Sequence, residues 1–300
     1  MRSKCTDAKT ADHCAEKMLR QRQASFNADC VMPIAPVCHL GTPVPANGVL
    51  QDSTFDRKAD TDDTSPMRPK PPSPAASHSY TAVIFDFEGT LVNFQWQLEP
   101  AEDELRAGFA RLGFEGGEFV RGNYATMWNA AADLLAPQGR MAELHQALGP
   151  IYDRWDFDAL TRWAPRQGAA ELLDQLVSDG LHVGMVSNIG RGALGGALER
   201  FDFAGCLLPV IARDDVTYMK PRAEGILRTL SHWQLAPAQV LFVGDSRADV
   251  FGARAAGVPV AIIRGGECDD TAFADTPPDH MISQLSELVA LIAGSTRASD

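Results

Sequence analysis

Six short, continuous runs of apolar residues constrain the fold of this 300-residue chain more than any other feature of its sequence. They lie at residues 81–85, 182–186, 207–211, 240–243, 259–263 and 280–282. Continuous apolar runs of this length are typical of strands buried on both faces of a parallel sheet. Amphipathic helical patterns fall between them, at 166–179, 222–234, 247–256 and 284–293. This alternation predicts an α/β fold with a doubly wound parallel sheet and right-handed crossovers.

One interval between predicted strands is too long for a single crossover helix. Residues 93–164 contain no strand-like run, and helical patterns recur within them, near 99–113, 118–135 and 140–149. Pro137 and Gly149 fit breaks between separate short helices. We therefore predict a helical cap domain at 93–164, inserted between the two parts of a core domain at 80–92 and 165–293.

The first 79 residues differ in composition from the rest of the chain. They hold nine of the nineteen prolines and show no sustained period of 3.6 or 2. The stretch 52–79 mixes charged residues with Ser, Thr and Pro, a composition that buries too little apolar surface to become ordered. We predict that residues 1–79 are a disordered extension or linker, or that translation starts later than Met1. Residues 294–300 are expected to form a flexible C-terminal tail.

The net charge of −12 lies in the second part of the chain, where residues 81–300 carry seventeen Lys/Arg and thirty Asp/Glu. Such an acidic body argues against nucleic acid or an anionic membrane as the main partner. No apolar run approaches the roughly 20 residues of a membrane span, and no apolar signal-peptide segment is visible. These features predict a cytoplasmic protein. An anionic substrate would need a metal or a few well-placed cations.

Polar residues follow four of the predicted strands, where a doubly wound sheet binds its ligands. They form four groups: Asp86-Phe87-Glu88-Gly89-Thr90-Leu91, Ser187-Asn188, Lys220-Pro221, and Gly244-Asp245-Ser246 with Asp249 one helical turn later. Taken singly, each group has an ordinary structural explanation, since Asp and Gly are common in turns and Ser-Asn is a good helix N-cap. Their occurrence in order along one predicted sheet favours a single ligand site over coincidence.

Together, the segments FDFEGTLV, VSN, MKP and GDSRADV resemble the four motifs of the haloacid dehalogenase-like hydrolases. The resemblance covers roughly residues 80–292. Residues 166–188 and 235–265 further resemble the phosphoglycolate phosphatase-like branch, whose cap domain is matched by the helical insert. The resemblance implies a magnesium-dependent phosphatase that cleaves a small phosphomonoester through an aspartyl-phosphate intermediate. The expected partner is a small phosphorylated metabolite, and the expected assembly is a monomer or homodimer.

The catalytic residues implied by the four motifs are Asp86, Glu88, Ser187 and Lys220. The Asp86 carboxylate is the candidate nucleophile, which divides one difficult displacement into two easier ones. Ser187 offers a hydroxyl at a helix N-terminus, and Lys220 a point charge for phosphoryl oxygens. Lys220 is the only lysine in residues 81–300, which argues against a solvated surface role. The substrate-binding residues are expected to be Thr90, Ser187, Asn188 and Lys220.

A divalent cation is required because a carboxylate nucleophile and a phosphate dianion repel each other. Mg²⁺ prefers oxygen ligands. The expected ligands are Asp86, the backbone carbonyl of Glu88, Asp245 and Asp249, the last binding directly or through water.

Glu88 departs from the family pattern, which usually reads D-x-D at the first motif. In the family this residue protonates the leaving oxygen and then deprotonates the attacking water. A glutamate reaches about one C–C bond further, and a misplacement of about 1 Å can cost roughly 100-fold in rate. Two alternatives therefore stay open: a phosphotransferase or phosphomutase with the same site, and a non-catalytic phosphate-binding relative.

Substrate recognition is expected from the insert. The residues considered are Arg121, Asn123, Tyr124, Trp128 and Arg140. Tyr124 and Trp128 at helical spacing are more often core residues, and the arginines are more often solvated.

Overall fold

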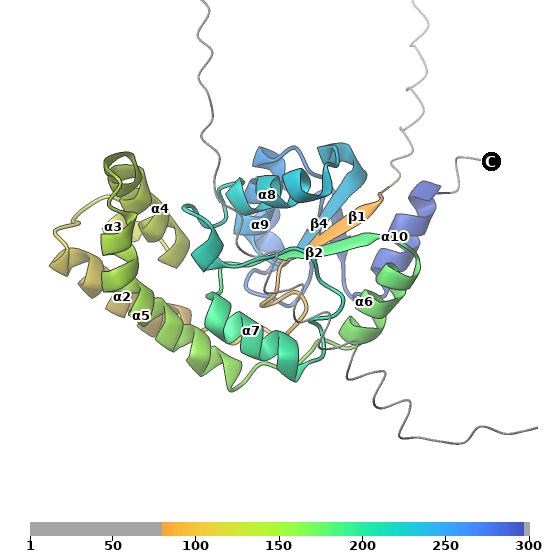
Figure 1. The fold of residues 1–300 in the computed structure, drawn as a ribbon, viewed down its shortest axis with the longest axis horizontal. Coiled ribbons are helices and arrows are strands. Elements are labelled where there is room, and N and C mark those ends of the chain that lie inside the picture. Colours follow the sequence, from red (N-terminus) through yellow and green to blue (C-terminus); the bar gives the residue numbers. More distant parts are fainter. Residues whose placement is uncertain (1–79, 297–300) are drawn as a thin grey trace, which may run out of the picture. The chain divides into compact units, whose positions relative to one another are not determined.

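The structure, a computed structural model, describes residues 80–296, with side chains to residue 293; the prediction for 1–79 and, of the tail predicted at 294–300, residues 297–300 lie outside this range. Residues 294–296 belong to a helix that ends at Thr296, so the predicted tail begins too early. Its centre is one six-stranded sheet in the order β3-β2-β1-β4-β5-β6, with every neighbouring pair parallel. The strands are β1 Ala82–Phe85, β2 His182–Val186, β3 Val210–Ile211, β4 Val240–Gly244, β5 Val260–Ile263 and β6 His280–Ile282 (Figure 1). The predicted α/β fold with a doubly wound parallel sheet is confirmed.

Both faces of the sheet are buried under helices, and successive side chains of a strand point to opposite faces. In β1, Val83 and Phe85 belong to one apolar cluster, whereas Ala82 and Ile84 belong to the other. The first cluster packs under α6 (Ala169–Ser178), α7 (Arg191–Arg200) and α10 (Glu287–Thr296). The second packs under α8 (Glu224–Trp233) and α9 (Arg247–Ala255), on the opposite face in Figure 1. This two-sided burial is why the strands appear as continuous apolar runs.

Two elements of the core differ from the sequence prediction. The third strand is limited to Val210–Ile211, because Pro209 has no N–H to donate to a ladder and lies at the sheet edge. Helix α7 was not among the predicted helices, because its Gly-rich sequence RGALGGALER has a weak helical pattern. Four short 3₁₀ segments complete the described core and insert: η1 Ala136–Gln138, η2 Arg213–Asp215, η3 Pro237–Gln239 and η4 Asp270–Phe273.

The interval between β1 and β2 is helical, as the missing strand pattern indicated. It contains α2 Leu98–Arg111, α3 Glu118–Arg121, α4 Tyr124–Leu135 and α5 Met141–Leu160. The predicted helix at 118–135 is split before Tyr124, where the Asn123 side chain caps α4 by accepting from the Thr126 N–H. The predicted break at Gly149 is wrong, because α5 continues through Gly149 and Pro150.

Continuation of α5 past Pro150 has a packing explanation. Proline removes one intrahelical hydrogen bond and crowds the preceding turn. Pro150 lies on the exposed side of the helix, while Ile151, Tyr152 and Ala159 in the second half are buried. Burial of these side chains outweighs the local cost of proline.

The segments that enter and leave the insert are hydrogen-bonded to each other. The Asn93 N–H donates to the Ala164 carbonyl, and the Ala164 N–H donates to the Asn93 side chain, at 3.0 and 2.7 Å. The chain therefore enters and leaves the insert through one paired strip of backbone.

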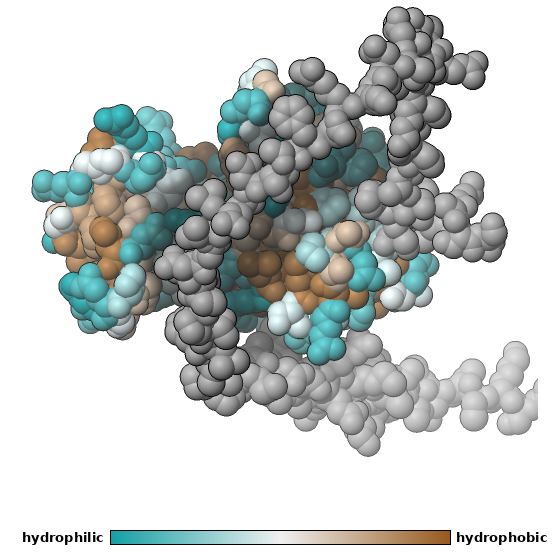
Figure 2. Space-filling model, turned by 90° about the horizontal axis from the view of Figure 1, so that it is seen from above, coloured by the Kyte–Doolittle hydropathy of each residue, from teal (hydrophilic) through white to brown (hydrophobic). Residues whose placement is uncertain are grey.

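The surface of the described residues mixes polar and apolar side chains, as Figure 2 shows for one face. The exposed large apolar residues are spread over several elements and are Leu112, Val120, Leu134, Phe157, Val177, Leu208, Leu227 and Phe251. Single exposed apolar side chains of this kind are normal. None of the described helices combines the length and apolar character needed to cross a membrane.

Candidate active site

The carboxyl ends of β1, β2 and β4 meet at one edge of the sheet. In the register of the sheet, Phe85 lies opposite Met185 of β2 and Val243 of β4, so the three strands end at the same level. Ligands of doubly wound sheets bind at this edge, near the point where the strand order reverses. The side chains that gather here are Asp86, Glu88, Ser187, Asn188, Lys220, Asp245 and Asp249.

The ammonium group of Lys220 lies between two buried carboxylates. Its Nζ is 2.6 Å from Asp86 Oδ1 and 2.6 Å from Asp249 Oδ1, and 4% of its side chain is exposed. Burial lowers the pKa of Lys220, but the charges of Asp249 and Asp86 outweigh it and raise the pKa above its ordinary value. The Asn188 side chain accepts from the Lys220 N–H at 2.9 Å and donates to its carbonyl at 3.2 Å. Asn188 therefore positions the lysine.

Backbone encloses the carboxylate of Asp245. Its Oδ1 accepts from Thr90 Oγ1 at 3.3 Å, and its Oδ2 accepts from the Glu267 N–H at 2.5 Å. A Cβ at Gly89 or Gly266 would lie 2.0 or 2.1 Å from Asp245 Oδ2, so neither position has room for a side chain. Gly89 also has φ of +81°, which glycine tolerates best. Thr90 is fully buried, and its hydroxyl faces Asp245.

Asp249 is placed by the start of α9. Its Oδ2 accepts from the Asp245 N–H, the Ser246 N–H and Ser246 Oγ, at 3.1, 3.0 and 2.7 Å. The Ser246 side chain accepts from the Asp249 N–H in return, which completes a capping box. The Gly244-Asp245-Ser246 segment therefore starts α9, as its ordinary structural explanation predicts, and also contributes to the site. Asp249 Oδ1 is left for Lys220.

Three carboxylates and one lysine leave this cluster with excess negative charge. Asp86, Asp245 and Asp249 each offer an oxygen, and these oxygens lie within 4.8 Å of one another. Burial raises the pKa of Asp86 to about 6; Lys220 opposes this rise and Asp249 adds to it. Burial, with the charges of Asp249 and Asp86, also raises the pKa of Asp245. Clustered carboxylate oxygens with uncompensated charge suit a hard divalent cation, so these residues fit Mg²⁺.

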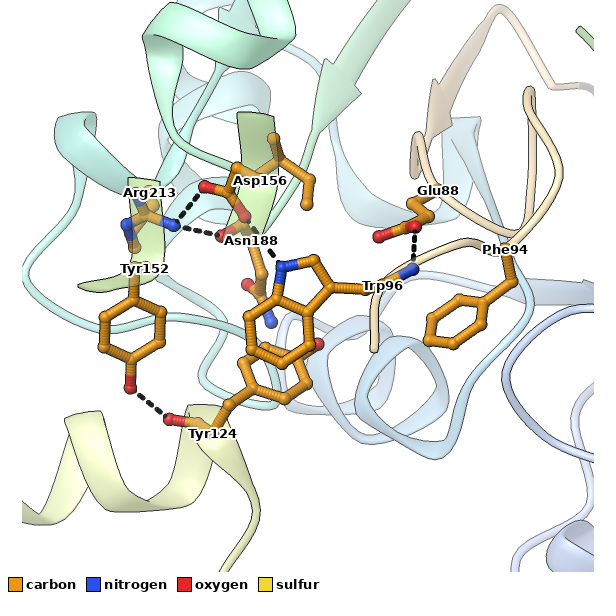
Figure 3. A pocket seen from close by; sticks show the side chains of 9 residues that line it. Glu88, Phe94, Trp96, Tyr124, Tyr152, Asp156, Asn188 and Arg213 are labelled. Carbon is orange, nitrogen blue, oxygen red and sulfur yellow. Dashed lines mark hydrogen bonds and ion pairs between the residues drawn. The ribbon is translucent and has the colours of Figure 1, made fainter. Parts of the chain in front are cut away.

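Glu88 lies beside this cluster and is held by the segments that enter and leave the insert. Its Oε1 accepts from the N–H groups of Gln95 and Trp96 at 2.7 and 2.6 Å, and from the Trp163 indole at 2.8 Å. Figure 3 shows the bond between the carboxylate and Trp96. Burial raises the pKa of Glu88 to about 7, although the three donors lower it. A carboxyl with this pKa can both donate and accept a proton near neutral pH.

Two adjoining pockets open beside the cluster, with empty volumes of about 310 and 270 Å³. The first is lined by Asp86, Ser187, Lys220 and Glu267, among others, and the second extends toward Arg213. Both share the side chains of Glu88, Phe94, Tyr124, Asn188 and Ile189. Thr90 lines neither pocket. The predicted substrate-binding residues other than Thr90 therefore face one continuous space.

Tyr124 is the insert residue among those considered for substrate recognition that reaches these pockets. Its hydroxyl interacts with the Asn188 side chain. Its ring packs 4.9 Å from the Trp96 ring, and its carbonyl accepts from the Tyr152 hydroxyl at 2.6 Å. The others lie elsewhere: Asn123 caps α4, Trp128 is buried with its indole on the Thr217 carbonyl, Arg140 pairs with Glu143, and Arg121 is exposed.

A buried ion pair in the second pocket was not predicted. Arg213 NH1 is 2.6 Å from Asp156 Oδ2, and each side chain is 2% exposed. Asp156 also accepts from the Trp96 indole at 3.1 Å (Figure 3). It accepts in addition from the Gly190 N–H at 2.9 Å. Arg213 pairs in addition with Asp153. No local sequence pattern identifies this network, because its members are far apart along the chain.

Glu267 was also missed, although a sequence signal for it exists. It follows Gly265-Gly266 after β5, so a search for polar residues beyond the fifth strand would have identified it. Its side chain lines the first pocket. Burial, then the charges of Asp249 and Asp86, raise its pKa to about 7.

Comparisons with known proteins place this geometry in context. A family model described as haloacid dehalogenase-like hydrolase matches residues 80–257. A phosphoglycolate phosphatase from Escherichia coli O157:H7 is 34% identical over 229 residues, covering 69% of this chain and 90% of that protein. One from Photorhabdus laumondii is 28% identical over 214 residues, covering 70% and 92%. A putative haloacid dehalogenase-like hydrolase structure from Bacteroides fragilis shares the fold, with TM-score 0.52, 24% identity, and coverage of 70% and 99%.

Proposed function

Because the chain belongs to the haloacid dehalogenase-like hydrolases, we propose that it is a Mg²⁺-dependent phosphatase that cleaves a small phosphomonoester through an aspartyl-phosphate. The phosphoglycolate phosphatases among its relatives support phosphate-ester hydrolysis. The observation that carries the proposal is the buried Asp86 carboxylate at the end of β1, within 2.6 Å of Lys220 and beside Asp245 and Asp249. This is an arrangement for a carboxylate nucleophile whose charge must be balanced during attack on phosphorus.

The reaction divides into two displacements at phosphorus. An Asp86 oxygen attacks the phosphorus atom, and the bond to the ester oxygen breaks as Glu88 delivers a proton to the departing alcohol. Water then attacks the phosphoryl group of phospho-Asp86 while the Glu88 carboxylate takes its proton, which releases inorganic phosphate and restores both residues. Lys220 and Ser187 bind the phosphoryl oxygens in both steps. The pKa of Glu88, raised to about 7, suits this double role.

The proposed Mg²⁺ ligands are Asp86, the Glu88 carbonyl and Asp245, with Asp249 binding directly or through water. When bound, the cation would neutralise the repulsion between carboxylates and phosphate. Thr90 and the Glu267 N–H hold the Asp245 carboxylate in place for this role. The two glycines beside Asp245 keep that space open.

The helical insert is proposed to act as a cap over a core formed by residues 80–92 and 165–293. Its Tyr124 lines the same pocket as Asp86. The chain enters and leaves the insert through the paired segments around Asn93 and Ala164, and buried bonds of Asn129 and Asp156 hold it against the core. Closure of such a cap excludes water other than the attacking molecule. A phosphate group suits the polar lining of this pocket, which includes Ser187 and Lys220.

The test is inorganic phosphate release by the full-length chain from p-nitrophenyl phosphate and a panel of phosphorylated metabolites. We expect release that needs Mg²⁺, is lost in EDTA, and falls at least about 1,000-fold in Asp86→Asn. Asp179→Asn, at an exposed site at the end of α6, is the matched control and should change little. Absence of Mg²⁺-dependent release, or equal release from Asp86→Asn, would refute the proposal.

The variant Glu88→Asp distinguishes an active phosphatase from a non-catalytic phosphate-binding protein. The anchored carboxyl of Glu88 predicts that the parent is active and that Glu88→Asp, which cannot span to all three donors, is slower by about 100-fold. An inactive parent with an active Glu88→Asp variant would instead identify a non-catalytic phosphate-binding protein. Transfer of phosphate to an added alcohol in place of water would identify a phosphotransferase.

A further inference from the structure

The cations that line the two pockets are already engaged by carboxylates. Within the described part of the chain these cations are Lys220 and Arg213. Lys220 lies between Asp86 and Asp249, where it faces the nucleophile and the phosphoryl group. Arg213 is 2% exposed and is held by Asp156 on one nitrogen and Asp153 on the other. Figure 3 shows the Arg213 guanidinium directed at Asp156. The guanidinium lies over the Tyr152 ring, 5.1 Å from the ring centroid. Neither cation is available to pair with a second anionic group on a substrate.

Arg166 is an arginine near the carboxylate cluster, but its side chain is engaged elsewhere. It lies near enough to Asp245 to sense its charge. Its guanidinium donates to the Gly89 carbonyl and, at 2.9 Å, to the Arg264 carbonyl. It lines a separate pocket beside Ser283 and neither of the two beside Asp86. It therefore supplies backbone support and not a counterion in the substrate space.

The pocket that contains Asp86 is lined by an additional acid, Glu267. The Glu267 backbone is fixed on Asp245, and its side chain enters the pocket that contains Asp86. The Tyr124 hydroxyl lies within reach of the charge of Glu267 and interacts with Asn188. The non-phosphate part of a bound substrate would therefore meet a carboxyl, a phenol and an amide.

From this distribution of charge, and resting on the proposed phosphatase function, we propose a substrate class: monophosphates of small alcohols that carry no second anionic group. Glu267 is the residue that sets this preference. An ammonium or hydroxyl group on the alcohol would find an acceptor at Glu267, whereas a carboxylate would face it without a counterion. Burying an unpaired charge is costly and like charges repel, so the penalty falls on anionic alcohols. The preference differs from the substrate named for the phosphoglycolate phosphatases among the relatives.

The experiment compares three two-carbon esters that differ in one terminal group: phosphoethanolamine, ethylene glycol monophosphate and 2-phosphoglycolate. With the full-length chain and Mg²⁺ at pH 8.5, we expect kcat/KM for each of the first two to exceed that for 2-phosphoglycolate by at least about 10-fold. Glu267→Gln removes the charge and keeps the backbone N–H on Asp245. It should raise kcat/KM for 2-phosphoglycolate relative to ethylene glycol monophosphate by about 10-fold. Glu171→Gln, an equal change of charge at an exposed site on α6, should leave the three ratios unchanged.

Each other result overturns a distinct statement. A parent enzyme that prefers 2-phosphoglycolate refutes the substrate class while leaving the phosphatase function intact. Ratios that do not move in Glu267→Gln refute the assignment to Glu267. Hydrolysis of p-nitrophenyl phosphate that depends on Asp86, measured in the same preparation, separates these failures from loss of the proposed function. If that hydrolysis is also absent, the phosphatase function fails and the substrate class fails with it.

Discussion

The additional methylene of Glu88, relative to an aspartate, gives its carboxylate a definite set of partners. The side chain reaches donors on both segments that join the insert to the core, Gln95 and Trp96 on one and Trp163 on the other. An aspartate would end about one C–C bond earlier and could not keep the same three bonds. The glutamate is thus matched to its surroundings by contacts that a shorter acid would lose.

Without metal, Glu88→Gln is expected to have a higher free energy of unfolding than the parent chain, and this difference should grow as pH rises. The Glu88 pKa in the folded chain is about 7, above its ordinary 4.5. The unfolded chain therefore releases this proton first, and parent stability is full below about pH 4.5 and falls until about pH 7. Glutamine does not titrate and keeps an oxygen for the three donors. A pKa difference of about 2.5 units corresponds to about 3 kcal/mol.

The measurement is the free energy of urea unfolding in EDTA at pH 4.5 and pH 8. The advantage of Glu88→Gln over the parent should grow by about 3 kcal/mol between the two pH values. Glu171→Gln, whose side chain is exposed, should show no such growth. A difference that stays constant with pH would mean that the ionisation of Glu88 is not penalised by folding.

At the scale of elements, one buried carboxylate bonds α5 to several parts of the core. Asp156 on α5 receives hydrogen bonds from Arg213, from the Gly190 N–H at the start of α7 and from the Trp96 indole. Three separate parts of the chain are therefore held by one side chain. This buried group ties the insert to the sheet beside the proposed substrate pocket.

Asp156→Ala is expected to cost about 3 kcal/mol of unfolding free energy, because the buried Arg213 loses its buried partner and keeps only Asp153, whose side chain is 50% exposed. The double variant Asp156→Leu/Arg213→Met should cost less than Asp156→Ala, since it removes both charges together. Urea unfolding of each variant checks both statements. Asp133→Ala breaks the exposed pair with Arg222 and serves as control, with an expected cost below about 1 kcal/mol. Equal costs for Asp156→Ala and the control would contradict the prediction.

At the scale of the whole molecule, a net charge of −12 and a buried cluster of carboxylates both favour cation binding. Mutual repulsion among the acids opposes the compact state, and one lysine balances only part of it. A cation that binds the folded chain alone adds to its stability by mass action.

Mg²⁺ is therefore expected to raise the Tm of the full-length chain. At about 100 times its dissociation constant the gain is about 2.7 kcal/mol. Thermal unfolding with MgCl₂ or with NaCl at matched ionic strength separates binding from screening. Asp245→Asn should lose most of the shift, because Asp245 is a proposed ligand. A shift of the same size in NaCl, or one retained in Asp245→Asn, would argue against a specific site.

Local patterns account for the parts of the fold that were predicted. Burial on both faces makes each strand a continuous apolar run, so all six strands could be located, and β3 alone is markedly shorter than its pattern because of Pro209. The break expected at Gly149 failed because packing of distant residues decided whether α5 continued. Helix α7 was missed because its own sequence has little helical preference.

Some features of the proposed site could likewise be predicted from local sequence, and others could not. Strand ends mark Asp86, Ser187 and Asp245 in the sequence, since parallel strands bring their carboxyl ends to one edge wherever the chain folds as α/β. The partners of these groups depend on contacts between segments distant along the chain, which no periodicity records. The anchoring of Glu88 by Trp163, the pairing of Arg213 with Asp156 and the entry of Glu267 into the pocket are of this second kind. Local sequence specifies which elements form and where polar groups end them, whereas packing between elements specifies which charges meet.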